Sequence, residues 1–192
     1  MKKLLLFAAL AVFGFTTTYA QNVRFGAKAG ANFASLTGDD VDDIDGRTSF
    51  HVGGVANIGI TELFSVQPEL IYSSQGASAD DSDGDLTLKL DYINIPIMAD
   101  FQLAEGFSLQ GGPQVGFNIS SKFDFDGDEE DVENIQTLDF GVGIGAQYVL
   151  PMNLFFQARY VIGITNVYEE FEGIDTEAQN SVVSVSVGYF FN

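Results

Sequence analysis

Apolar and polar residues alternate along most of the chain with a period of two, which is the pattern of β-strands that have two different faces. In the clearest stretch, 137–148, one face carries large apolar side chains and the other carries mostly glycine. The pattern predicts eight strands, at about 23–35, 48–60, 64–74, 86–102, 107–122, 137–148, 154–166 and 181–192.

The connections between these strands are alternately long and short. The long ones have 11 to 14 residues and the short ones have 3 to 5. The long connections are 36–47, 75–85, 123–136 and 167–180, and the short ones are 61–63, 103–106 and 149–153. This alternation places all four long loops at one end of the structure. They hold 21 of the 27 acidic residues, so the acidity of the chain is concentrated at that end.

The polar face of the strands is built mainly from Gly, Ser, Asn and Gln. Mixed charges are the usual choice for a face in water, whereas small residues and amides suit a narrow lumen. The large apolar face would then contact lipid, and an open sheet edge is not tolerated there. Aromatic residues near the short turns fit an interfacial girdle: Phe25, Phe64, Phe101, Phe107, Tyr148, Phe156, Tyr189 and Phe191. We therefore predict an all-β fold, a closed eight-stranded antiparallel up-and-down transmembrane β-barrel.

Segment 86–102 departs from the simple alternation. Leu86, Leu88 and Leu90 occupy even positions, whereas the apolar residues from Ile93 onward occupy odd ones. This change of phase predicts a β-bulge between Leu90 and Ile93. Pro96 lacks a backbone N–H and marks a candidate second irregularity.

The first twenty residues have the order of a secretory signal: a basic head, an apolar run and a small polar end. We expect cleavage after Ala20, which divides the chain into a signal peptide, 1–20, and a barrel domain, 21–192. No later stretch is long and apolar enough for a spanning helix. The chain has no Cys, and a net charge of −19 argues against nucleic-acid binding. The expected location is the outer membrane of a Gram-negative cell envelope.

Three short motifs resemble the PorT-like outer-membrane β-barrel family, which is common in Bacteroidota. They are Phe25-Gly26-Ala27-Lys28-Ala29-Gly30, Gln67-Pro68-Glu69-Leu70-Ile71-Tyr72-Ser73 and Leu90-Asp91-Tyr92-Ile93-Asn94-Ile95-Pro96. The resemblance implies an outer-membrane location, and most members have no assigned activity. PorT itself is linked to protein secretion, a role that resemblance of fold does not transfer.

The inward phase carries three cations and three anions, which we predict to form an ion network in the lumen: Arg24, Lys28, Glu69, Asp100, Asp139 and Arg159. We expect Lys28, Glu69 and Arg159 to meet at one level. Such a network either plugs the barrel or forms a charged constriction that selects solutes. The interior of an eight-stranded barrel is just filled by its side chains, which favours the plug.

Catalysis would need a nucleophile and a base. His51 is the single histidine, and Ser49 lies two residues away on the same face. Both point to the lumen by phase, and no orienting acid is visible, so we expect no enzyme.

The acidic loops invite comparison with calcium sites. Two sets of aspartates alternate around a glycine: Asp81, Asp83 and Asp85, and Asp124, Asp126 and Asp128. Neither set has the spacing of an EF-hand. We expect no firm cofactor and keep loose Ca²⁺ or Mg²⁺ binding by these loops as an alternative.

The leading functional hypothesis is a small, non-catalytic outer-membrane barrel with a structural or surface-interaction role. A narrow porin-like channel for small solutes and a lipid-modifying barrel enzyme are the alternatives. We expect a monomer in contact with outer-membrane lipids, with an extracellular or envelope protein as an unidentified partner.

Overall fold

The computed structural model describes residues 23–37, 45–81, 84–125, 128–132, 135–167 and 178–191. The expected signal peptide lies outside these ranges. The strands are β1 (Val23–Thr37), β2 (Asp45–Gly59), β3 (Phe64–Asp81), β4 (Gly84–Ala104), β5 (Phe107–Phe125), β6 (Asp128–Asp131), β7 (Leu138–Val149), β8 (Leu154–Gly163) and β9 (Gln179–Phe190). No helix in the described ranges is long and apolar enough to cross a membrane.

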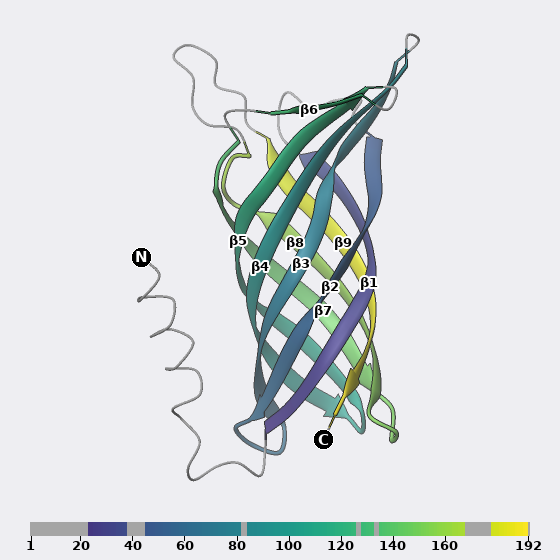
Figure 1. The fold of residues 1–192 in the computed structure, drawn as a ribbon. Helices are drawn as coiled ribbons and strands as arrows, with labels where there is room; N and C mark the ends of the chain where they lie inside the picture. The colour runs from purple at the N-terminus through teal and green to yellow at the C-terminus, as the bar shows by residue number, and fades with distance from the viewer. Residues whose placement is uncertain are drawn as a thin grey trace, which may run out of the picture.

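All strands except β6 form one closed antiparallel barrel. Each pairs with the barrel strands that precede and follow it in the chain, and β9 pairs with β1 to close the ring, for example at Gly26 and Phe190. β1 begins and β9 ends at the end of the barrel that carries the short turns (Figure 1). The predicted eight-stranded up-and-down barrel is therefore confirmed.

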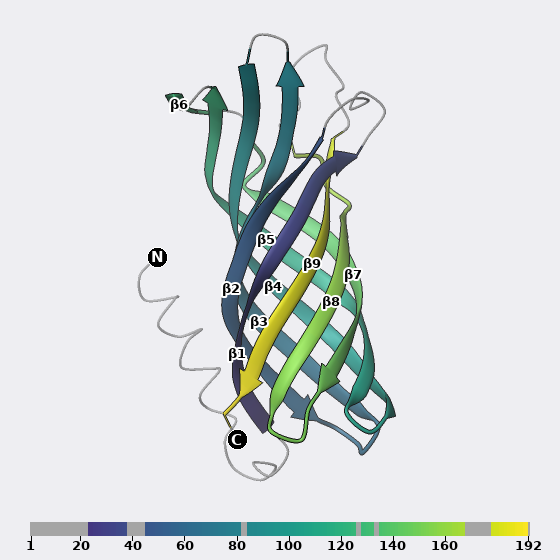
Figure 2. The same cartoon turned by 90° about the vertical axis from the view of Figure 1, so that its right-hand side faces the viewer.

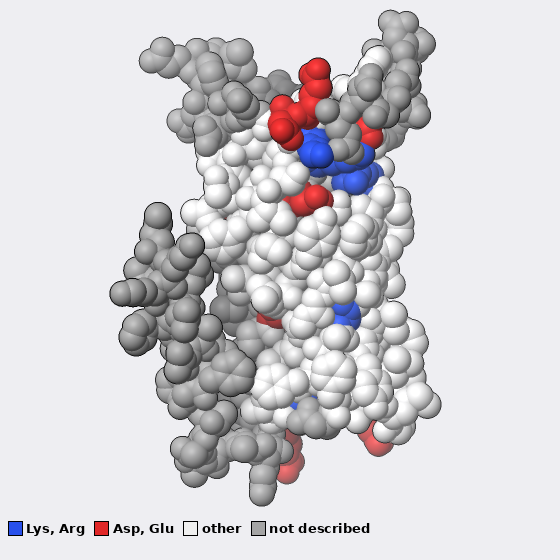
Figure 3. Space-filling model, in the orientation of Figure 1, with Lys and Arg blue, Asp and Glu red and all other residues white. Residues whose placement is uncertain are grey.

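The two faces of the wall divide as the alternation predicts. In β7, Asp139, Gly141 and Gly143 are buried in the interior, whereas Leu138 and Ile144 are exposed on the outer face. Most of the girdle aromatics also project outward near the short turns. In the view of Figure 3, the middle of the wall carries few charged side chains, and most of them gather towards the two ends. An outer face of large apolar side chains with few charges is suited to contact with membrane lipid.

The predicted long loop 75–85 is wrong, because most of it continues as strand. β3 and β4 stay paired from Gln75 and Leu90 to Asp81 and Gly84, so this hairpin extends past the neighbouring strands (Figure 2). The Ser-, Ala- and Asp-rich composition suggests a loop, but here the backbone pairs with the apolar outer half of β4. β6 adds a short strand to the outer end of β5 in the same region.

The predicted change of phase in β4 is also wrong. Leu88, Leu90 and Tyr92 are buried, and the same even positions continue inward to Asp100. The leucines face the lumen because its outer part is filled by a buried apolar cluster. The position of the predicted β-bulge is confirmed, because the β4–β5 register shifts between Asp91 and Tyr92, although the extra residue is Ile119 on β5. The β4–β5 register passes Pro96 without a shift.

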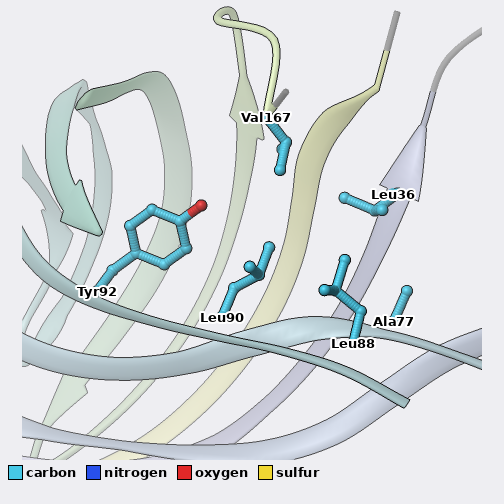
Figure 4. Close-up of a cluster of buried hydrophobic side chains, with 6 residues drawn as sticks. All are labelled: Leu36, Ala77, Leu88, Leu90, Tyr92 and Val167. Carbon is cyan, nitrogen blue, oxygen red and sulfur yellow. The ribbon is translucent and has the colours of Figure 1, made fainter. Parts of the chain in front are cut away.

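The members of this cluster, which we call the outer apolar cluster, come from β1, β3, β4 and the segment that follows β8. They are Leu36, Ala77, Leu88, Leu90, Tyr92 and Val167, and they point towards one another across the lumen (Figure 4). Phe123, Val132 and Ile135 pack against them. The outer part of the lumen is therefore a small hydrophobic core.

Candidate functional site

Three charged residues from three strands meet inside the barrel. Glu69 of β3 accepts hydrogen bonds from Lys28 Nζ of β1 at 2.8 Å and from Arg159 of β8. The Arg159 contact is bidentate, with nitrogen–oxygen distances of 2.8 and 2.7 Å. The side chains of Lys28 and Arg159 are 4% exposed and that of Glu69 is 0% exposed. Buried charges need such pairing, because an unpaired buried ion is strongly destabilising.

Four glutamines surround the three charges and fill the rest of the cross-section. Lys28 donates to Gln157, Arg159 donates to Gln110, and Gln67 donates to Glu69, with distances of 2.6, 3.1 and 2.9 Å. Gln157 also bonds to Gln110 and Gln147. We call these seven residues the lumen network: Lys28, Gln67, Glu69, Gln110, Gln147, Gln157 and Arg159. The three charges were predicted from the sequence, whereas the four glutamines, which share the same inward phase, were not predicted as part of the network.

The other three predicted charges lie outside this meeting point. Arg24 donates to Asn57 at 3.3 Å, and Asp100 accepts from Ser108 and Gln110 at 3.0 and 2.7 Å. Within the described ranges, neither takes part in an ion pair within 4.0 Å. Gln110 connects Asp100 to the lumen network, because it also accepts from Arg159.

Asp139 likewise has only neutral partners among the described side chains. It accepts hydrogen bonds from Thr165 at 2.8 Å and from Asn180 at 3.2 Å. Asn180 also donates to the hydroxyl of Tyr92, which belongs to the outer apolar cluster. Asp139 therefore belongs to the outer part of the lumen.

The structure separates the two residues considered for catalysis. Ser49 donates to the carbonyl of Ser74 at 2.6 Å. The ring nitrogens of His51 lie 2.8 Å from Asn32 Oδ1 and 2.8 Å from Ser186 Oγ. Asn32, His51 and Ser186 are 1%, 4% and 2% exposed, so this row is enclosed by the wall. In this row both ring nitrogens of His51 are taken up by hydrogen-bond contacts with interior side chains.

A small cavity of about 30 Å³ lies against the lumen network. Its lining includes Asn94 and Arg159, and two atoms of these side chains, Asn94 Oδ1 and Arg159 Nε, are buried without a hydrogen-bond partner in the protein. A cavity of this size has room for ordered water, which can both donate and accept. Water is therefore the natural partner of these two atoms.

Most of the predicted metal ligands lie where the structure gives no side-chain description. Asp83 and Asp126 fall outside the described residues, as do the side chains of Asp81, Asp85 and Asp128. Asp124 pairs with Lys89. Among the described side chains, no three carboxylates or imidazoles are grouped to hold a metal ion.

A closed barrel with a lipid-facing apolar wall and a buried polar network across its lumen defines a small outer-membrane β-barrel protein. The family model described as "Outer membrane protein beta-barrel domain" matches residues 19–169. The chain belongs to this family, and its location is the outer membrane. No curated protein matches the chain.

Solved structures of small bacterial barrels have the same fold. Neisserial surface protein A is 18% identical over 87% of this chain and 97% of its own, with a TM-score of 0.62. Ail, the attachment invasion locus protein of Yersinia pestis, is 16% identical over 89% of this chain and 100% of its own, with a TM-score of 0.56. A second structure of Ail, in complex with the heparin analogue sucrose octasulfate, is 15% identical over 89% of this chain and 100% of its own, with a TM-score of 0.54.

Proposed function

We propose that this protein is a non-catalytic, non-conducting barrel with a structural or surface-interaction role in the outer membrane. The observation that carries the proposal is the lumen network, which joins β1, β3, β5, β7 and β8 across the interior through side chains that are almost fully buried. The outer apolar cluster supports it, because it fills the lumen nearer the long-loop end. A solute would have to break buried ion pairs and pass apolar side chains.

The surface role rests on the end of the barrel that carries the long loops. The β3–β4 hairpin and β6 project there, and Glu130 and Asp131 of β6 are exposed. The long-loop segments assigned from the sequence hold 21 acidic residues. This end therefore suits a positively charged extracellular partner. Ail differs in this respect, because it was solved with a negatively charged ligand, sucrose octasulfate.

Two oppositely charged probes test the surface role. We expect a fluorescent oligolysine peptide to bind the protein in lipid nanodiscs and to be released by salt, because exposed charges are screened over about 10 Å at 0.1 M. Sucrose octasulfate should not bind. The variant Glu130→Gln/Asp131→Asn should weaken oligolysine binding, and tighter binding of sucrose octasulfate than of oligolysine would contradict the proposal.

We also propose that the protein is exported with cleavage after Ala20. The intact mass of the protein from outer membranes tests this cleavage. We further propose that the barrel is a monomer, which light scattering in detergent tests. The resemblance to PorT-like proteins supports the fold, and no secretion role is proposed from it. The enclosed Asn32–His51–Ser186 row gives no support to a lipid-modifying enzyme.

A further inference from the structure

A large cavity of about 790 Å³ opens at the short-turn end of the barrel. Its inner walls include Arg24, Asn57, Asp100 and Ser108, and Glu62 and Glu105 of two short turns lie at its rim. Short turns of outer-membrane barrels face the periplasm. We call this cavity the periplasmic vestibule. The lumen network separates it from the outer end, so it is a pocket with one entrance.

Asp100 presents a fixed carboxylate to the vestibule. It is 6% exposed, and its Oδ2 atom accepts hydrogen bonds from Ser108 Oγ at 3.0 Å and Gln110 Nε2 at 2.7 Å. Gln110 is itself held by Arg159 in the lumen network. Both bonds are made to Oδ2, so they fix the orientation of the carboxylate, and Asp100 lines the cavity with further acceptor capacity.

Arg24 presents a fixed cation to the same cavity. Its guanidinium lies 4.5 Å from the centre of the Phe190 ring and donates to Asn57 Oδ1 at 3.3 Å. Stacking and one hydrogen bond leave donors available, because a guanidinium has five N–H groups. Arg24 and Asp100 share the vestibule without forming an ion pair within 4.0 Å. Each therefore keeps capacity for an external charged group.

We propose that the periplasmic vestibule binds a small zwitterion, an amino acid or a short peptide, with its carboxylate on Arg24 and its ammonium group on Asp100. Fixed groups of both signs in one partly enclosed cavity favour a ligand that carries both charges, because charge-assisted hydrogen bonds are strongest there. The volume lies in the range of small-molecule sites. Glu62 and Glu105 at the rim disfavour purely anionic ligands.

Three matched dipeptides test the proposal: alanylalanine, its N-acetyl derivative without the ammonium group, and its C-terminal amide without the carboxylate. Binding is followed by amide chemical-shift changes in NMR spectra of the full barrel in nanodiscs. We expect saturable binding of alanylalanine, with shifts confined to the short-turn end of the strands. Each derivative should bind at least about tenfold more weakly, because each lacks one charge-assisted bond.

Matched variants assign the two charges. Asp100→Asn should lower the affinity for alanylalanine at least about tenfold and leave the affinity for the N-acetyl derivative unchanged. Arg24→Gln should lower the affinity for alanylalanine in the same way and leave the affinity for the C-terminal amide unchanged. Glu130→Gln on β6, exposed at the opposite end of the barrel, is the control and should change affinity less than about threefold. Heat-modifiable gel migration establishes that each variant is folded. No saturable binding of alanylalanine, or equal binding of all three dipeptides, would overturn the proposal.

Discussion

Glu69 and Arg159 face each other across the interior and form a bidentate ion pair with nitrogen–oxygen distances of 2.7 and 2.8 Å. They come from β3 and β8, which are not neighbours in the barrel. With Lys28 they leave one net positive charge in a site shielded from bulk water. The pair therefore links opposite parts of the wall as well as filling the lumen.

Removing Glu69 should destabilise the barrel strongly. Glu69→Ala leaves Lys28 and Arg159 buried together without an anion, and we expect a loss of about 3 kcal/mol or more in the free energy of unfolding. Urea unfolding in lipid vesicles, followed by heat-modifiable gel migration, measures it. The exposed Glu62→Ala variant should change stability by less than about 0.5 kcal/mol. Equal urea midpoints of unfolding for Glu69→Ala and Glu62→Ala would contradict the prediction.

Leu90 should matter for packing although the barrel lies in lipid. It is completely buried in the outer apolar cluster, so Leu90→Ala leaves a cavity and should cost about 2–5 kcal/mol. Leu63→Ala in a short turn is the control, because Leu63 is 66% exposed. The same unfolding assay compares them. A Leu90→Ala variant as stable as Leu63→Ala would show that the cluster does not pack as described.

Gly76 allows β3 to continue beside β4. Its φ is +123°, and a Cβ atom at this position would overlap the Leu88 carbonyl oxygen. Gly76→Ala should therefore destabilise the hairpin by about 1–3 kcal/mol. Gly54→Ala is a matched control, because the nearest atom to its added Cβ would be 3.9 Å away. Similar losses for the two variants would argue against the backbone conformation at Gly76.

Divalent cations test the expectation for the acidic loops. Millimolar Ca²⁺ should slow amide exchange in the segments that hold Asp81, Asp83, Asp85, Asp124, Asp126 and Asp128, because carboxylates are oxygen ligands for this ion. Exchange in the lumen network should stay unchanged, since its charges are enclosed. Mass spectrometry with and without Ca²⁺ measures both. Equal exchange in all segments would leave the loops as a solvated surface.

The alternation of residues was enough to predict the barrel, because one face meets lipid and the other meets a narrow lumen. Charges on the inward phase pointed to Glu69, Lys28 and Arg159. The pattern failed at Leu88 and Leu90, because it cannot distinguish a leucine in lipid from one in an apolar part of the lumen. It also could not assign hydrogen-bond partners to Asp100, since these depend on the stagger between strands.

We propose that the lumen network and the outer apolar cluster together close the lumen of the barrel. Planar-bilayer conductance tests it most directly, with the variant Lys28→Ala/Glu69→Ala/Arg159→Ala as a matched control that removes the three charges together. We predict no conductance steps for the unaltered protein or for this variant, because the outer apolar cluster still fills the lumen, and measurable steps for a folded variant that also carries Leu88→Ala and Leu90→Ala. Steady steps from the unaltered protein would contradict it and establish the narrow channel instead.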